Sequence, residues 1–380
     1  MKISCEKAVL SESLNTCYRA IPSKSTIPAL EGFLIDCTGQ PMVIGSSLEM
    51  TIKAPLPTQV LQPGAIVLTA RLFFDIVKNL SDDMVTIEVD DRLMTTISCG
   101  AAVYNLIGMN KDDYPEIPVF DGDRTIELPQ GAFKSMISKT IHAVSVNDTK
   151  IVLTGSLFEV SGKRFRIVAT DSFRLAIRQE DLQKDAEDHY SFIVPGQAQK
   201  EIARLLRDTG ADPAQDQDAQ NIVRISSGKK HVMFEFGGAL LISRLLEGEF
   251  LNYEKILPRE FKFSALCQAE DIQASIERVS LIVSESIKSP VVFLFDDNIL
   301  KLRCQTALGK AYDECKISGD GEGLEIGFNS RYMLDALKAC DSGKISMRFI
   351  SGISPCVITG TEDDRFLHLI SPVRIRNSND

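Results

Sequence analysis

The chain has 380 residues, of which 44% are hydrophobic and 25% charged, and this composition excludes a disordered protein. At about 150 residues per domain, the length predicts two or three domains whose cores need no disulfide or metal. No segment approaches the ~20 apolar residues of a membrane span, and the N-terminus turns polar at once, so we expect a cytoplasmic protein with no membrane partner.

The residue types that usually carry catalysis or bind metals are scattered. The nine cysteines include no CxxC pair, which favours buried thiols over zinc ligands or disulfides. The four histidines lie far apart, and the chain contains no GxxxxGKS/T, GxSxG or HExxH motif. Carboxylates are numerous but stand mainly in polar loops. We therefore expect no enzymatic activity, no metal and no cofactor.

Hydrophobic periodicity predicts the same order of elements three times: a helix, two strands, a second helix and two more strands. In the first copy, strands are predicted at 30–37 and 41–50, a strand leading into a helix at 65–80, and two strands within 84–100. Corresponding segments are 153–162, 164–173, 191–206 and 221–238, and then 289–298, 299–308, 324–340 and 344–360.

The apolar stripes of the three first helices match at Leu10, Phe133 and Ile272, and the second helices match at Ala70, Pro195 and Asn329. Near-equal spacing over the whole chain predicts three copies of one α+β domain. We place these domains at 1–123, 124–249 and 250–380.

The predicted second helices have basic residues opposite their apolar faces. These residues are Arg71 and Lys78, then Lys200, Arg204 and Arg207, then Arg331 and Lys338. Basic residues of the first helices, including Arg19, Lys139, His142 and Arg278, also lie away from the apolar stripe. A single charged helix face is usually just solvated. Its recurrence in three copies of a chain with net charge −10 instead indicates segregated positive charge that contacts double-stranded DNA through its phosphates, independently of sequence.

Several segments resemble the bacterial DNA polymerase III beta subunit (sliding clamp) family. They are STIPALEGFLID, SSLEM, ATDSFRLA at 169–176, LEGEFLNYEKILP at 246–258, IGFNSRYMLDAL at 326–337 and HLISPVRI at 368–375. The resemblance implies a homodimeric ring of sliding-clamp domains, with helices lining the inside and antiparallel sheets outside. Such a ring encircles duplex DNA, is opened by a separate clamp loader, and gives a polymerase its processivity.

The resemblance also implies a hydrophobic cleft between the second and third domains. This cleft binds short hydrophobic motifs of the DNA polymerase catalytic subunit, the clamp loader and repair proteins. The matching residues are Leu153, Thr170, Leu175, Leu251, Ile256, Asn329, Tyr332, Ile353, Pro355, Ile370, Pro372, Val373 and Arg374. Leu153, Leu175 and Ile370 are equally compatible with ordinary strand core. We expect the terminal strand to be docked on the third domain, because undocked termini fray.

Some positions depart from the family pattern. Ser172 replaces a glycine, Leu251 a proline, Lys255 an arginine and Ser371 a hydrophobic residue, while residues 376–380 extend the usual end. For DNA, Lys24 and Arg71 match basic positions of the family, and Asn147 replaces a glutamine. These departures affect the expected peptide preference more than the expected fold.

Ring closure requires a free strand edge on the first domain that pairs with the third domain of a second copy. The candidates are 103–108, with Tyr104 and Leu106, and the strand around 310–315, with Leu281 and Ile282 nearby. Tyr104 and Leu106 could also face their own core. Two alternatives compete with the ring: a clamp-fold paralogue or adaptor that binds peptides with altered specificity or no longer encircles DNA, and an enzyme that uses scattered carboxylates.

Overall fold

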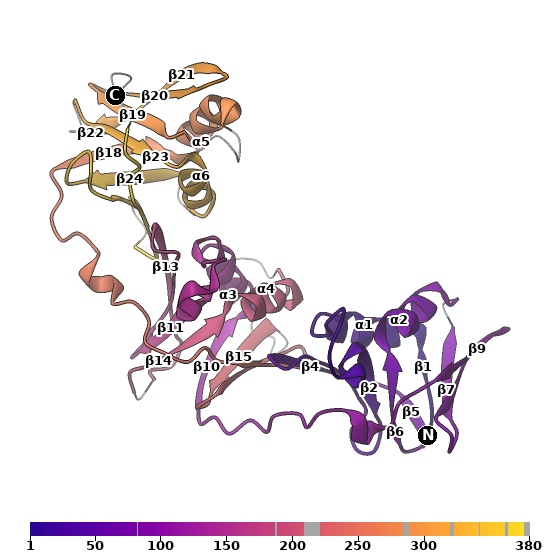
Figure 1. Ribbon diagram of the computed structural model, residues 1–380. Coiled ribbons are helices and arrows are strands. Elements are labelled where there is room, and N and C mark those ends of the chain that lie inside the picture. The colour runs from indigo at the N-terminus through magenta and orange to yellow at the C-terminus, as the bar shows by residue number, and fades with distance from the viewer. Residues whose placement is uncertain are drawn as a thin grey trace. The chain divides into compact units, whose positions relative to one another are not determined.

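The computed structural model describes residues 1–81, 83–186, 188–208, 221–283, 289–319, 323–341, 343–361 and 364–375. They form two compact units (Figure 1). The first unit comprises Met1–Phe133 and Glu201–Leu245, and the second comprises Lys134–Lys200 and Leu246–Asp380. The predicted middle copy therefore contributes strands to both units.

Among the described residues, each copy is built from two similar halves, each with a strand, a helix and three strands. The six α-helices are α1 (Lys7–Tyr18), α2 (Ala70–Asn79), α3 (Gln130–Ser138), α4 (Gly196–Leu205), α5 (Ala269–Val279) and α6 (Ser330–Lys338). This order confirms three α+β copies. The predicted unit was too small, because it lacked the strand before each first helix and the third strand of most halves.

The strands of the first unit form two antiparallel sheets. They are β1 (Lys2–Glu6), β2 (Gly32–Asp36), β3 (Met42–Ser46), β4 (Met50–Pro55), β5 (Gln59–Gln62), β6 (Ala65–Thr69), β7 (Met84–Val89), β8 (Met94–Cys99), β9 (Ala102–Ile107), β10 (Arg124–Pro129), β15 (Ile222–Ser227), β16 (His231–Phe236) and β17 (Ala239–Arg244). One sheet has the order β5-β1-β7-β8-β9, and the other has the order β10-β15-β16-β17-β4-β3-β2-β6. The second sheet joins the middle copy to the first through β17 and β4, with Leu241 opposite Ile52.

The second unit repeats this arrangement. Its strands are β11 (Gly155–Ser161), β12 (Arg164–Thr170), β13 (Arg174–Asp181), β14 (Tyr190–Pro195), β18 (Phe263–Gln268), β19 (Val291–Asp296), β20 (Ile299–Thr306), β21 (Gly309–Lys316), β22 (Ser318–Gly319), β23 (Glu325–Phe328), β24 (Lys344–Phe349), β25 (Cys356–Gly360) and β26 (Phe366–Ile370). The sheet β14-β11-β12-β13-β26-β25-β24-β18-β22 joins the middle copy to the third through β13 and β26. The other sheet is β21-β20-β19-β23.

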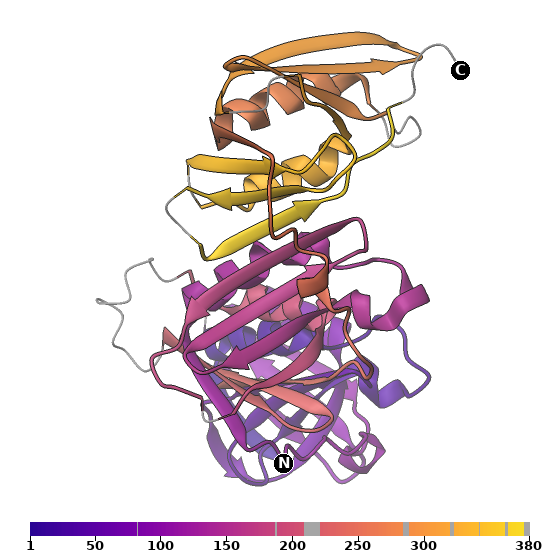
Figure 2. The same ribbon diagram turned by 90° about the vertical axis from the view of Figure 1, so that its left-hand side faces the viewer.

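The helices bury the apolar stripes that the sequence predicts. Leu10, Leu14 and Cys17 of α1 and Phe73 of α2 are fully buried. In the third copy, Ile272 and Ile276 of α5 are buried in one core with Met333 and Leu337 of α6. The ribbons of these two helices lie next to each other in the third copy (Figure 2). The helix ends are also electrostatically favourable, because Lys78, Arg204, Arg278 and Lys338 lie in last turns, where cations oppose the negative end of the helix dipole.

Seven of the nine cysteines are buried and two are partly buried, which confirms the predicted burial of most of them. Burial raises the pKa of the Cys17 thiol to about 12, so this thiol is a core residue and not a nucleophile. Within the described parts of the chain, no helix is long and apolar enough to cross a membrane. Those parts also hold no group of three or more His, Cys, Asp or Glu side chains arranged for a metal ion.

Candidate functional site

The C-terminal strand is held by two copies. β26 pairs with β25 of the third copy, as expected for a docked terminus, and with β13 of the middle copy, which was not predicted. In the latter pairing Leu175 lies opposite Leu369. Both side chains are buried in one cluster with Val357, and the partly buried Leu257 packs against it. The predicted peptide-binding residues therefore surround a continuous sheet that crosses from one copy to the next.

Arg174, at the start of β13, connects the loop before this strand to α6. Its guanidinium donates hydrogen bonds to Asp171 Oδ2 at 3.0 Å, to Asp335 Oδ2 at 2.6 Å and to the carbonyl oxygen of His142. It also lies 4.3 Å from the centroid of the Tyr332 ring, a cation–π arrangement. Three polar partners and a ring fix the position of this arginine beside the predicted cleft residues.

The loop that leads into Arg174 contains Ser172, at a position where the resemblance implies glycine. Ser172 has a φ of +76°, in the left-handed region that glycine adopts without strain. Thr170 stabilises the turn, because its hydroxyl donates to the carbonyl oxygen of Arg174 at 2.7 Å and accepts from the N–H of Ser172 at 3.2 Å. Serine therefore adopts here a backbone conformation that suits glycine, and the hydroxyl of Thr170 helps to hold it.

Hydrogen bonds to the backbone hold other predicted cleft residues in the same region. The side chain of Asn329 caps α6 by accepting from the N–H groups of Arg331 and Tyr332. The N–H of Val373 donates to the carbonyl oxygen of Gly327 at 2.8 Å, and that of Ser371 donates to the carbonyl oxygen of Phe173 at 2.9 Å. The chain end, the start of α6 and the loop before β13 are therefore neighbours.

The predicted cleft residues range from buried to exposed, and Asn329 is partly buried. Leu153, Thr170, Leu175 and Ile370 are buried, as expected of strand and core residues. Tyr332, Pro355 and Pro372 are partly buried, and Arg374 is exposed. The apolar residues available at the surface are Leu251, Ile256, Ile353 and Val373, and Ile353 is the most exposed at 88%. The predicted extension 376–380 lies outside the described residues.

Phe173 is a surface residue that sequence reasoning missed. Its side chain is 62% exposed, and its carbonyl oxygen accepts the N–H of Ser371. A large apolar residue next to the polar turn residues Asp171 and Ser172 was the available signal. Phe173 therefore joins Ile353 and Val373 among the exposed apolar side chains of this region.

A polar cluster lies between α6 and the strands β13 and β26. Arg178 forms ion pairs with Glu180 at 3.0 Å and with Asp341 at 2.6 Å, and Lys139 also pairs with Asp341. The ring centroids of His142 and His368 are 5.6 Å apart. Burial, with smaller contributions from nearby arginines, lowers the pKa of His142 to about 4 and that of His368 to about 3, so both are neutral at neutral pH.

This cluster corrects part of the predicted basic surface. Lys139 and His142 were expected on a positive outer helix face, but Lys139 is paired with a carboxylate and His142 is mostly buried and uncharged. Arg278 pairs with Asp313 of its own copy, although its side chain stays 59% exposed. For Lys139 and His142 the prediction failed because helical projection places a residue on a face but cannot show which other copy covers that face.

The remaining predicted DNA-binding residues are at the surface. Exposed positions are Lys24 in its loop, Arg71 and Lys78 on α2, Asn147, Lys200 and Arg204 on α4, and Arg207 just after α4. Arg204 Nη1 donates to Glu201 Oε1 at 2.7 Å, and Arg19 lies 3.5 Å from the same carboxylate. The side chain of Glu201 is only 6% exposed, so water screens its charge little. Its negative charge therefore offsets part of the positive potential of these two arginines.

Among the described residues eight strands end a sheet, and β9 and β21 are the two of them that are the last strand of their half. Each of these two strands is the third strand after the helix of its half. The strands in the same position of the other four halves are β4, β13, β17 and β26, and they pair at the joints between copies. On β9, Tyr104 is 40% exposed and Leu106 partly buried, while Leu281, in the turn after α5, is 84% exposed and Ile282 partly buried. Exposed apolar residues beside an open strand edge are typical of an association surface.

Repeated α+β copies that share sheets edge to edge, with helices on one face, define the class of DNA clamps, and comparisons with known proteins agree. Models of the DNA polymerase III beta subunit match in chain order: the N-terminal domain at residues 1–118, the central domain at 127–252 and the C-terminal domain at 254–374. The beta sliding clamp of Halalkalibacterium halodurans is 32% identical, covering 98% of this chain and 100% of that protein.

Solved structures show the same relationship in three dimensions. The DNA polymerase sliding clamp from Bacillus subtilis has a TM-score of 0.93 and 30% identity, covering 99% of this chain and all of that chain. The sliding clamp from Pseudomonas aeruginosa bound to griselimycin has a TM-score of 0.90 and 26% identity at the same coverage. The chain belongs to the beta sliding clamp family of DNA polymerase III, whose members are non-catalytic processivity subunits that work with DNA and a polymerase in replication.

Proposed function

We propose that two copies of this chain close into a ring around duplex DNA through the open edges of β9 and β21. The observation behind this proposal is that the six halves end in equivalent strands. Among these strands β4 pairs with β17 and β13 pairs with β26, which leaves β9 and β21. An unpaired edge associates readily unless it is blocked. Tyr104 and Leu106 on β9 would pack near Leu281 and Ile282 of the second copy.

We also propose that the ring contacts DNA through exposed side chains on or near the helices. These side chains are Lys24, Arg71, Lys78, Asn147, Lys200, Arg204 and Arg207. Lysine and arginine that meet phosphates bind without regard to base sequence and release counterions, so the contact should be weak and salt-sensitive. The pairing of Arg204 with Glu201 favours a weak contact, as a ring that slides requires.

For protein partners, we propose a peptide site around the joint of β13 and β26. Its exposed apolar residues would bind leucine and phenylalanine anchors of the polymerase catalytic subunit, the clamp loader and repair proteins, while Asn329 and Arg374 orient the peptide. Griselimycin, which is bound to the Pseudomonas aeruginosa clamp, is a suitable competitor. The proposed domains remain 1–123, 124–249 and 250–380, and the proposed compartment is the cytoplasm, where bacterial chromosomes are replicated.

The test combines solution mass with retention on DNA. A ring predicts twice the monomer mass of 42.0 kDa by light scattering. It also predicts that protein assembled by a clamp loader stays on circular DNA and slides off the same DNA after linearisation. A monomer that still binds peptide would favour the adaptor alternative, and equal retention on both DNA forms would contradict topological binding.

A further inference from the structure

The segment 246–262, which we call the strap, connects the middle and third copies along the sheet face opposite to Arg174. The N–H of Leu246 donates to the carbonyl oxygen of Ile193 at 3.0 Å, and the N–H of Lys262 donates to that of Phe349 at 2.9 Å. Between these ends, Phe250, Tyr253, Leu257 and Phe261 pack against the sheet. The ends of the strap are therefore fixed by backbone bonds and its middle by side chains.

Tyr253 is the only polar side chain among these inward-facing anchors, and it is 4% exposed. Its hydroxyl donates to Glu159 Oε2 on β11 at 2.6 Å and accepts from Arg166 Nη1 on β12 at 2.8 Å. Arg166 also donates to Gln179 Oε1 at 3.4 Å. The hydroxyl thus binds a carboxylate and a guanidinium that belong to the middle copy, and hydrogen bonds to charged groups are stronger than neutral ones.

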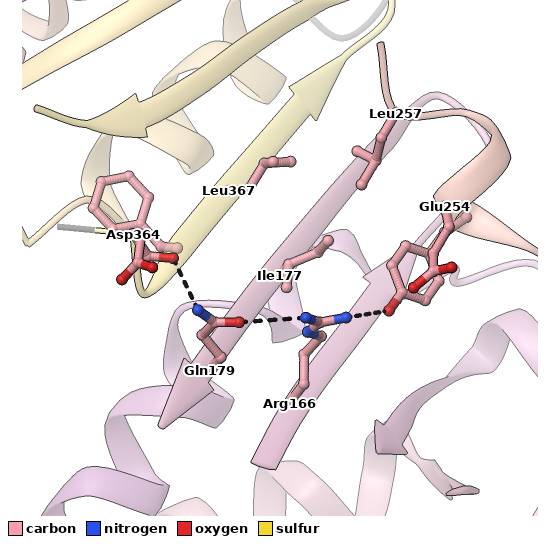
Figure 3. A pocket seen from close by; sticks show the side chains of 9 residues that line it. Arg166, Ile177, Gln179, Glu254, Leu257, Asp364 and Leu367 are labelled. Carbon is pink, nitrogen blue, oxygen red and sulfur yellow. Dashed lines mark hydrogen bonds between the residues drawn. The ribbon is translucent and has the colours of Figure 1, made fainter. Parts of the chain in front are cut away.

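A pocket of about 320 Å³ that opens to solvent is lined in part by this anchor, and Figure 3 shows its other lining residues. Its lining includes Arg166, Ile177, Tyr253, Leu257 and Leu367. Leu257 is only partly buried beside this pocket, so its apolar contacts hold this part of the strap less firmly than a close-packed core would. The position of the strap here therefore depends on the bonds of the Tyr253 hydroxyl.

The residues on either side of the anchor face the other way. Leu251 is 40% exposed and Ile256 is 43% exposed, and both belong to the proposed peptide site. Leu251 lies two residues before the fixed tyrosine and Ile256 three residues after it, so a shift of the tyrosine displaces both side chains together. The short 3₁₀ turn Tyr253–Lys255 connects the tyrosine to Ile256, so it fixes the place of Ile256 relative to Tyr253.

We propose that Tyr253 is a positioning residue for peptide binding: its bonds to Glu159 and Arg166 hold the strap so that Leu251 and Ile256 are presented to the partner peptide. This inference rests on the proposed peptide site. It assigns a role to a buried polar group that does not itself touch the peptide.

The experiment uses the full-length chain and a fluorescein-labelled short peptide with leucine and phenylalanine anchors. Tyr253→Phe removes only the hydroxyl, and Glu254→Gln is the matched control because it changes a charge on the same strap and lines the same cavity. We expect Tyr253→Phe to weaken peptide binding about five- to tenfold by anisotropy, the loss of roughly one charge-assisted hydrogen bond. Glu254→Gln should bind within about twofold of the parent chain.

Two further measurements separate positioning from general destabilisation. Trypsin cleavage after the exposed Lys255 and Arg259, followed by mass spectrometry, should accelerate in Tyr253→Phe while the melting temperature stays within about 4 °C of the parent. Adding Glu159→Gln to Tyr253→Phe should weaken binding little further, because both changes remove the same bond. These results would support the proposal.

The failures are distinguishable. If the parent chain does not bind the peptide, the proposed peptide site is wrong. If the parent binds and Tyr253→Phe binds equally well, or if it only melts earlier with unchanged binding and unchanged strap cleavage, then the positioning role is wrong and the peptide site stands.

Discussion

Arg174 and Asp335 connect the middle copy to the second helix of the third copy, with Arg174 Nη1 donating to Asp335 Oδ2 at 2.6 Å. Their side chains are 11% and 28% exposed, so the pair is only partly screened by water. The same arginine lies over Tyr332, next to the proposed peptide site. One ion pair therefore supports both the joint between two copies and the surface that the joint creates.

Replacing Asp335 with Asn should lower the free energy of unfolding by about 1–3 kcal/mol, because a largely buried arginine loses a charged acceptor. Chemical denaturation, followed through the unfolding transition of the second unit, would measure the change. Lys338→Gln on the same helix is the control: its pair with Glu277 is surface-exposed and should contribute less than about 1 kcal/mol. Equal effects of the two variants would contradict a special role for the Arg174–Asp335 pair.

Leu281→Asp should prevent ring closure. A charge on a side chain that is 84% exposed costs the monomer little, but it would be buried against the second copy without a partner. Light scattering should report a monomer, and retention on circular DNA should be lost while the labelled peptide still binds. Val119→Asp introduces the same charge at a position that is 89% exposed and should leave the dimer intact.

Replacing Lys200 and Arg207 together with Glu should weaken DNA binding and reduce its salt dependence. Each lost phosphate contact lowers the slope of log K against log salt by about one unit. Titrations of a labelled duplex at several salt concentrations would measure the slope. Lys229→Glu with Lys230→Glu makes the same charge change in the turn between β15 and β16. If that control lowers the slope equally, total charge and not the helix surface determines binding.

Stability should decrease on acidification because of His142 and His368. Their folded pKa values, about 4 and about 3, lie below the ordinary value of 6.5, so between pH 6.5 and about 4 the unfolded chain binds more protons than the folded chain. The free energy of unfolding therefore falls as the pH falls through this range.

Comparing variants isolates this contribution from that of the carboxylates. In His368→Gln, the slope of the free energy of unfolding against pH between 4 and 6 should be smaller by the amount that about one bound proton contributes. An unchanged slope in His368→Gln would mean that His368 already binds its proton in the folded state.

The sequence alone was sufficient for the repeat, the fold class and the burial of the helix stripes. Leu10, Phe133 and Ile272 recur because each copy must bury one helix face on a sheet, and this requirement leaves a periodic signal in the chain. The family resemblance added the proposed sites residue by residue. Both kinds of inference depend on local sequence patterns, which can be identified without knowing which residues are neighbours in three dimensions.

Only the tertiary structure decided which charges remain available and which segments meet. Lys139 is paired with Asp341 from another copy, Arg204 is opposed by the buried Glu201, and Tyr253 is bonded to two middle-copy strands. None of these partners is close in sequence to the residue that it binds, apart from Glu201. The energy of a charge or a hydroxyl depends on the atoms packed around it, and these atoms are brought together only when the copies join their sheets.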